Sequence, residues 1–203
     1  MISQKKLAAI ESRAAQGDTE AMYDIAQRAL GGHGVEQNPS RARELIERAA
    51  AEGHAKSLYL LGVWQQTGEF GPENPAKAAD LYRRAGEAGH GRAWLNLGIL
   101  HQVGLGIEAD MQAAADAYRK GAEAGSGHAG ANLGNLYETG ALNDGDPDYA
   151  KAADWYKTAI RLGYAEARSA LDNLHAATGI PAVMTDVPRA KSGVLWKRLL
   201  GLR

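Results

Sequence analysis

The chain has 203 residues, of which 45% are hydrophobic and 23% are charged, and its net charge is −1. These values are ordinary for a globular protein, and such a charge gives no general attraction to nucleic acid. Cysteine is absent, which excludes disulfides, thiolate nucleophiles, iron–sulfur clusters and cysteine-ligated zinc. No stretch has membrane-spanning length, and the first residues contain no apolar signal segment, so we expect a cytoplasmic protein.

Glycine recurs at a fixed interval along the chain. One series has a step of 36 residues and comprises Gly17, Gly53, Gly89 and Gly125, with Gly163 following after 38. A second series keeps the 36-residue step and comprises Gly32, Gly68, Gly104 and Gly140. A repeat of about 20 to 50 residues is typical of a solenoid, in which one supersecondary unit stacks on the next.

Each repeat is predicted to contain two helices separated by a glycine-bearing turn. The second helix starts after a side-chain cap at four equivalent places, namely Asn38 before Pro39, Asn74 before Pro75, Asp110 and Asp148. It runs to a glycine of the first series, as in RAAAEGH and RAGEAGH, so we expect left-handed backbone at these glycines.

Small residues on the first helices predict close helix packing. In each first helix, two inward residues four positions apart share one face of the helix. The residue beside them is small, which leaves room for a neighbouring helix: Ala26, Gly62, Gly98 and Gly134. The second helices share an inward pattern of an alanine followed four residues later by a larger residue: Ala42 and Ile46, Ala78 and Tyr82, Ala114 and Tyr118, Ala152 and Tyr156.

The glycine series also predict how the chain is divided. Residues 1–178 form one solenoid, residues 179–192 read as a linker, and residues 193–203 form a basic amphipathic segment. The solenoid contains a half unit at 1–17, full units at 18–53, 54–89, 90–125 and 126–163, and a half unit at 164–178.

The order A-x-x-x-L-G, a glycine-rich turn, K-A-A-x-x-Y and a closing A-E-x-G resembles the Sel1-like repeat family, which is related to tetratricopeptide repeats. The resemblance spans roughly residues 7–178. It implies an all-α fold, a right-handed α-solenoid of antiparallel helix pairs, which usually serves as a scaffold or adaptor. Two turns depart from the family pattern: Gly68-Glu69-Phe70-Gly71, and Gly140-Ala141-Leu142 with two extra residues.

If the first helices line the concave side, as in related repeats, residues pointing away from the packing face form a candidate binding strip. The strip comprises Tyr23, Gln27, Tyr59, Val63, Gln66, Leu95, Ile99, Gln102, Ala131, Asn135 and Glu138. Its apolar centre and amide rim are typical of a peptide groove, whereas single members such as Val63 equally fit packing between units.

Other polar residues are weaker candidates. Lys56, Arg92 and His128 occupy one repeat position and either meet an acidic partner or form an ordinary solvated face. No histidine pair has the spacing of a helical zinc site, and the aspartates of NDGDPD lack the glutamate that completes a calcium loop. We therefore expect no metal, no cofactor and no catalytic residue.

The last residues differ in charge from the rest of the chain. Residues 189–203 contain five basic residues and no acidic one, so residues 1–188 carry a charge of −6. Apolar side chains occur there at helical spacing: Leu195, Trp196, Leu199, Leu200 and Leu202. Three roles remain open for this segment: it covers the exposed end of the solenoid, it docks on another protein or a second copy of this chain, or it contacts an anionic membrane surface.

These patterns favour a non-enzymatic scaffold or adaptor that binds a peptide or partner protein on the concave face. One alternative is a regulator or immunity-type protein that neutralises a single partner. A further alternative is an enzyme whose site the sequence does not reveal, in which case His101, His128, Tyr137 and Glu138 would converge on one pocket.

Overall fold

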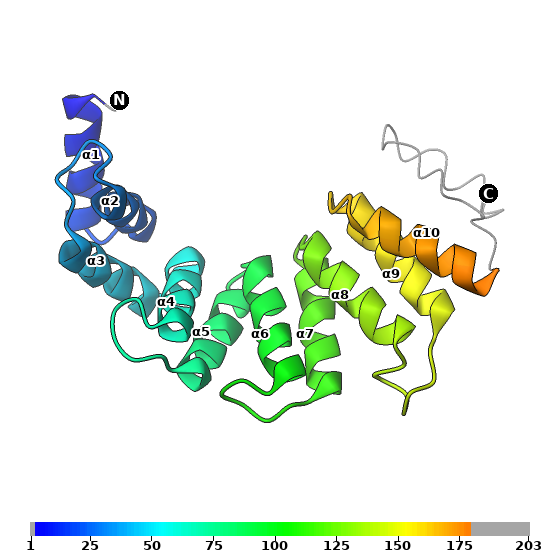
Figure 1. Ribbon diagram of the computed structural model, residues 1–203. Coiled ribbons are helices and arrows are strands. Elements are labelled where there is room, and N and C mark those ends of the chain that lie inside the picture. The colour runs from blue at the N-terminus through cyan, green and yellow to red at the C-terminus, as the bar shows by residue number, and fades with distance from the viewer. Residues whose placement is uncertain (1–2, 180–203) are drawn as a thin grey trace, which may run out of the picture.

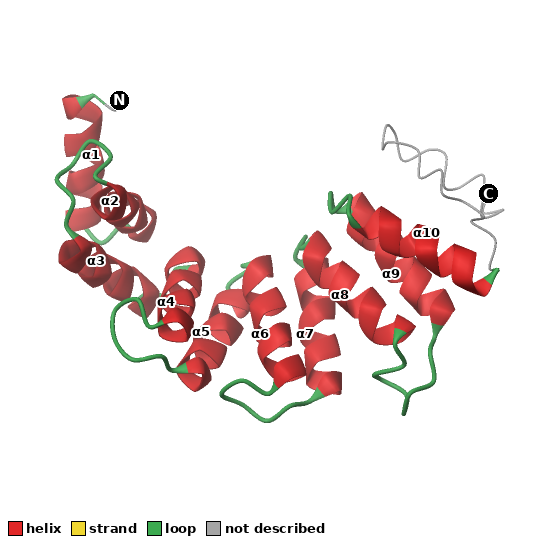
Figure 2. Cartoon of the chain, in the orientation of Figure 1, coloured by secondary structure: helices red, strands yellow, loops and turns green. Residues whose placement is uncertain are grey.

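The computed structural model describes residues 3–179. Over these residues the chain forms ten α-helices and no strand (Figure 2). The helices are α1 (Gln4–Ala15), α2 (Thr19–Gly31), α3 (Pro39–Ala51), α4 (Ala55–Thr67), α5 (Pro75–Glu87), α6 (Gly91–Val103), α7 (Met111–Glu123), α8 (Gly127–Glu138), α9 (Tyr149–Arg161) and α10 (Ala167–Thr178). The predicted segment with Leu195, Trp196, Leu199 and Leu200, and the linker beyond Gly179, lie outside the described residues.

The helices stack in chain order into an arc (Figure 1). The most extensive packing joins α2 to α3, α4 to α5, α6 to α7 and α8 to α9. We call α2, α4, α6, α8 and α10 the first helices, and α1, α3, α5, α7 and α9 the second helices. The loop from each first helix to its second helix follows the outer edge of the arc, the long-loop edge, and the short turns follow the opposite turn edge (Figure 1). The predicted α-solenoid is confirmed.

The predicted helix starts are confirmed by hydrogen bonds. The side chains of Asn38, Asn74, Asp110 and Asp148 each accept a hydrogen bond from the backbone N–H three residues later, at 2.9–3.0 Å. These bonds satisfy donors that the first turn of a helix otherwise leaves unpaired. At the other end of the second helices, the glycines of the first series have φ between +80° and +95°. Glycine is favoured there because a side chain would strain left-handed backbone.

In the second helices α5, α7 and α9, a tyrosine lies against a glycine of the preceding first helix. A Cβ atom added to the glycine would lie 2.5–2.8 Å from a ring carbon in three pairs: Gly62 with Tyr82, Gly98 with Tyr118, and Gly134 with Tyr156. In the first unit the equivalent positions hold Ala26 and Ile46, which share one core cluster and are fully buried. The ring thus occupies the space that the missing side chain leaves, as the small-residue pattern predicted.

No helix within residues 3–179 combines the length and the apolar character needed to cross a bilayer.

Candidate functional site

The first helices carry the predicted binding strip, and they approach one another closely. In addition to its second-helix neighbours, α6 packs directly against α8. The strip residues of these two first helices therefore lie on neighbouring helices of one face. The strip residues of α6 and α8 are near enough to form one continuous surface, and α4 is the preceding first helix.

Three residues of the strip are held by buried tyrosine hydroxyls. Tyr82 donates a hydrogen bond to Gln66 Oε1 at 2.7 Å, and Tyr118 donates one to Gln102 Oε1 at 2.6 Å. In the next unit Tyr156 donates to Glu138 Oε2 at 2.5 Å. We call these three pairs the tyrosine–amide ladder, although its last acceptor is a carboxylate.

Burial of the rings has an electrostatic consequence. Ionised tyrosine is disfavoured away from water, so burial raises the pKa of Tyr82 to about 12. Burial also raises the pKa of Tyr118, and burial together with the Glu138 carboxylate raises the pKa of Tyr156. Each hydroxyl therefore stays a neutral hydrogen-bond donor at physiological pH.

The apolar members of the strip differ in exposure. Ile99 is 38% exposed, whereas Val63 and Leu95 are half-buried and pack against core clusters. Sequence reasoning missed Val103, which lies one helical turn beyond Ile99 and is 62% exposed. The exposed apolar part of the strip is thus centred on the C-terminal half of α6. Val103 could have been identified from the sequence, because it lies four residues after Ile99 and therefore on the same face of the helix.

The aromatic members of the strip contact histidines of the next unit. Tyr59 stacks on His90 with ring centroids 4.3 Å apart, and Tyr23 meets His54 edge-on at 5.5 Å. His54 also contacts the buried Ser57 hydroxyl through Nδ1 at 2.9 Å. These tyrosines therefore join neighbouring units and offer a partner only part of their surface.

The remaining strip residues lie at its rim. Gln27 and Ala131 are half-buried, and Asn135 is exposed. The structure adds two residues that sequence reasoning missed, Asn96 and Asn132, which contact the hydroxyl groups of Tyr82 and Tyr118. Both asparagines lie one repeat apart on α6 and α8, so their 36-residue offset could have identified them.

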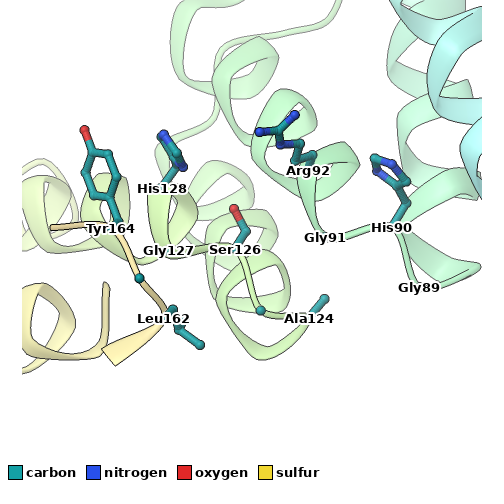
Figure 3. Close-up of a pocket in the computed structure, with 12 residues that line it drawn as sticks. Gly89, His90, Gly91, Arg92, Ala124, Ser126, Gly127, His128, Leu162 and Tyr164 are labelled. Atoms are coloured by element: carbon teal, nitrogen blue, oxygen red, sulfur yellow. The ribbon is translucent and has the colours of Figure 1, made fainter. Parts of the chain in front are cut away.

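The predicted basic row lies at the turn edge. Lys56 is paired with Glu20 at 2.6 Å, and the hydrogen bonds from Lys56 and His54 hold the pKa of Glu20 below its usual value. Arg92 and His128 instead line a cavity of about 390 Å³ at the starts of α6 and α8 (Figure 3). The row is thus divided between an ion pair and an open cavity.

The four residues that would have supported an enzyme do not line one common pocket within residues 3–179. Glu138 is bound to Tyr156, His128 lies against the Tyr164 ring at the turn edge, and Tyr137 lines a cavity at the long-loop edge. Within residues 3–179 no group of three or more His, Asp or Glu side chains has the arrangement of a metal site.

Stacked helix hairpins with an exposed strip along their first helices define the chain as an α-solenoid repeat protein. The model of the Sel1 repeat matches residues 19–54, 55–90, 93–126 and 128–164. The chain therefore belongs to the Sel1 repeat family. The unit boundaries drawn from the glycine series remain a prediction. A comparison with curated protein sequences gave no match.

Several solved structures are similar to this chain. A Sel1 repeat protein from Oxalobacter formigenes is 30% identical with a TM-score of 0.78, and the match covers 88% of this chain and 73% of that one. A protective antigen of uropathogenic Escherichia coli with an SLR fold is 25% identical with a TM-score of 0.76. That match covers 84% of this chain but only 36% of the antigen.

A third structure, an immunity protein from Pseudomonas aeruginosa, is 21% identical with a TM-score of 0.52. The match covers 79% of this chain and 59% of that protein. At this level of sequence identity, the similarity shows a shared fold alone.

Proposed function

We propose that this chain is a protein-interaction module whose first-helix strip binds an extended peptide or a segment of a partner protein. Sel1 repeats generally mediate protein–protein interaction, and the repeat fold is a non-catalytic scaffold. The proposal adds to this general role a surface, namely the strip on α4, α6 and α8.

The tyrosine–amide ladder carries the proposal. The hydroxyls of Tyr82 and Tyr118 fix the amide oxygens of Gln66 and Gln102, and the two amide NH₂ groups have no hydrogen-bond partner within residues 3–179. Both glutamines are half-buried, so their donors are held in place at the surface. Oriented donors one repeat apart suit the carbonyl groups of an extended chain, because their orientation needs no further ordering on binding.

Apolar contact supplies the second part of the recognition. Ile99 and Val103 are exposed on the same helix as Gln102, and the half-buried Val63 lies on the preceding first helix. Exposed apolar side chains gathered beside oriented polar groups are the usual composition of a binding site for a peptide. The expected ligand therefore places one or two apolar side chains over α6.

The proposal is tested with peptides selected from a random displayed library against the full chain. Affinities are then measured by calorimetry for the wild type, for Ile99→Glu with Val103→Glu, and for Leu162→Glu. Leu162 is the matched control because it is 37% exposed and lies at the turn edge. We expect the double variant to bind the selected peptides at least about tenfold more weakly, since two apolar contacts are replaced by charges.

Equal binding of selected peptides to all three proteins would contradict the strip as the binding surface. The immunity-type alternative predicts a different result, in which no peptide is enriched and one folded protein of the host copurifies at equal stoichiometry. Circular dichroism of each variant verifies that helical content is unchanged.

A further inference from the structure

The long-loop edge is acidic beside the last two helix hairpins. The two loops 104–110 and 139–148 contain no Lys or Arg, and they contain the acidic residues Glu108, Asp110, Asp144, Asp146 and Asp148. Of these five, only Asp148 forms an ion pair within the described residues, with Lys151 at 3.0 Å. The other four carboxylates have no cation paired with them within residues 3–179, although Asp110 accepts the cap hydrogen bond of α7 and Asp146 accepts one from Asn143.

Exposed apolar residues flank the same two loops. Leu105 is 45% exposed, Met111 37% and Tyr149 39%. Loop 139–148 and the start of α7 line a cavity of about 300 Å³, whose lining includes Gln112, Leu142 and Asp146. We call the two loops together with Met111 and Tyr149 the acidic loop edge. Exposed apolar side chains interspersed with unpaired carboxylates form a surface that suits a basic amphipathic segment.

This chain contains such a segment, and it begins close to that surface. The helix α10 runs from the turn edge to Gly179 at the long-loop edge, beside the loop that joins α8 to α9 (Figure 1). Fifteen residues lie between Gly179 and Leu195. Extended at about 3.3–3.6 Å per residue, they reach at most about 55 Å. This distance is ample for two neighbouring repeats.

We infer that residues 189–203 dock on the acidic loop edge of the same molecule. The five basic side chains of the segment lie near Glu108, Asp144 and Asp146, and its apolar face, which includes Trp196, covers Leu105 and Met111. The free end of the solenoid is a poorer surface for this segment, because the exposed side chains of α10 are small or polar, as at Arg168, Ser169, Asp172 and Asn173. The inference concerns a different surface from the first-helix strip, so neither depends on the other.

The absence of cysteine allows a direct test by disulfide trapping in the full chain. One variant carries Ala141→Cys in the acidic loop edge and Gly201→Cys in the basic segment. The control variant carries Ala165→Cys with Gly201→Cys, because Ala165 is also exposed but lies at the turn edge, one α10 length or about 18 Å from the long-loop edge. We expect the Ala141 pair to form an intramolecular disulfide about tenfold faster than the Ala165 pair, because docking raises the effective concentration of the two thiols.

Charge reversal then tests the electrostatic part. Glu108→Lys with Asp146→Lys should slow closure of the Ala141 pair about fivefold, since each exposed ion pair contributes modestly. The matched control, Glu52→Lys with Glu123→Lys, changes the net charge equally at the turn edge and should leave closure unchanged. If the reversed protein loses helical content, closure of the parent pair in about 1 M salt replaces it, because screening weakens the same contacts.

Three results would overturn the inference. Equal closure of the Ala141 and Ala165 pairs would mean that the segment has no preferred surface. Closure insensitive to both charge reversal and salt would remove the acidic residues from the contact. Disulfide-linked dimers whose yield grows with protein concentration would assign the surface to a second copy of the chain. None of these results bears on peptide binding to the first-helix strip.

Discussion

Three glycines of the first helices have a steric role in this protein. The hydrogen atom at Gly62, Gly98 or Gly134 permits a fully or nearly fully buried tyrosine ring to lie directly against the helix backbone. The same approach places each tyrosine hydroxyl on a strip residue, as with Tyr118 and Gln102. Packing inside the solenoid and orientation of its surface amides are thus coupled through single residues.

Gly98→Ala should therefore destabilise the protein by about 1–3 kcal/mol, because the added Cβ would lie 2.5 Å from the Tyr118 ring. This loss exceeds the gain of about 1 kcal/mol that alanine has over glycine in a helix. The free energy of unfolding, measured with urea, checks the prediction.

Gly130→Ala is the matched control, since its Cβ would meet neighbouring atoms at 3.5 Å, an ordinary contact distance. That change should be neutral or slightly stabilising. In a Tyr118→Ile background the cost of Gly98→Ala should shrink, because the first unit already pairs Ala26 with Ile46. A cost that stays the same in that background would refute the ring contact as its cause.

Each helix is delimited by its own end residues. The second helices α3, α5, α7 and α9 start at an Asn or Asp cap, whereas the N-cap residues of α4 and α6, His54 and His90, make no side-chain cap bond. Those two histidines instead contact tyrosines of the preceding unit. The starts of these first helices are thus fixed partly by contacts between units, and those of the second helices by local hydrogen bonds.

Asp110→Ala should lower the free energy of unfolding by about 1 kcal/mol, because the N–H of Ala113 loses its acceptor at the start of α7. Asp110→Asn keeps an acceptor oxygen at the same place and should change stability by much less. Chemical denaturation of the three proteins measures both effects. Equal losses for alanine and asparagine would show that charge, and not capping, is the source.

Across the whole molecule, stability is distributed among neighbouring hairpins. The core of the described residues contains four clusters, and each joins helices that are consecutive in the chain, at most α3 to α7. In such an array each unit is supported by its immediate neighbours and not by one central core. Opening at one end therefore need not spread to the other.

Leu171→Ala tests this distribution. Leu171 on α10 is 1% exposed and belongs to the cluster with α9, so its truncation should cost about 2–5 kcal/mol locally. Hydrogen exchange followed by mass spectrometry should show faster exchange in α9 and α10, with α2 to α5 unchanged. A uniform increase along the chain would indicate a single cooperative unit instead.

The sequence was sufficient to predict the repeat length, the solenoid, the capped starts of the second helices, the left-handed glycines and the buried positions of both helices. These features depend on residues close together in the chain, and they recur every 36 residues. The recurrence allows the pattern to be recognised in the sequence, because each unit has the same packing and hydrogen-bonding requirements.

The tertiary structure decided which candidate residues are available to a partner. It buried part of Tyr59 and of Leu95 in contacts with neighbouring helices, exposed Val103, and placed the amide oxygens of Gln66 and Gln102 on tyrosine hydroxyls. It also brought two acidic loops to the edge where α10 ends. These arrangements depend on how far each hairpin rotates on the next, a quantity that arises from packing between units and that no single repeat encodes.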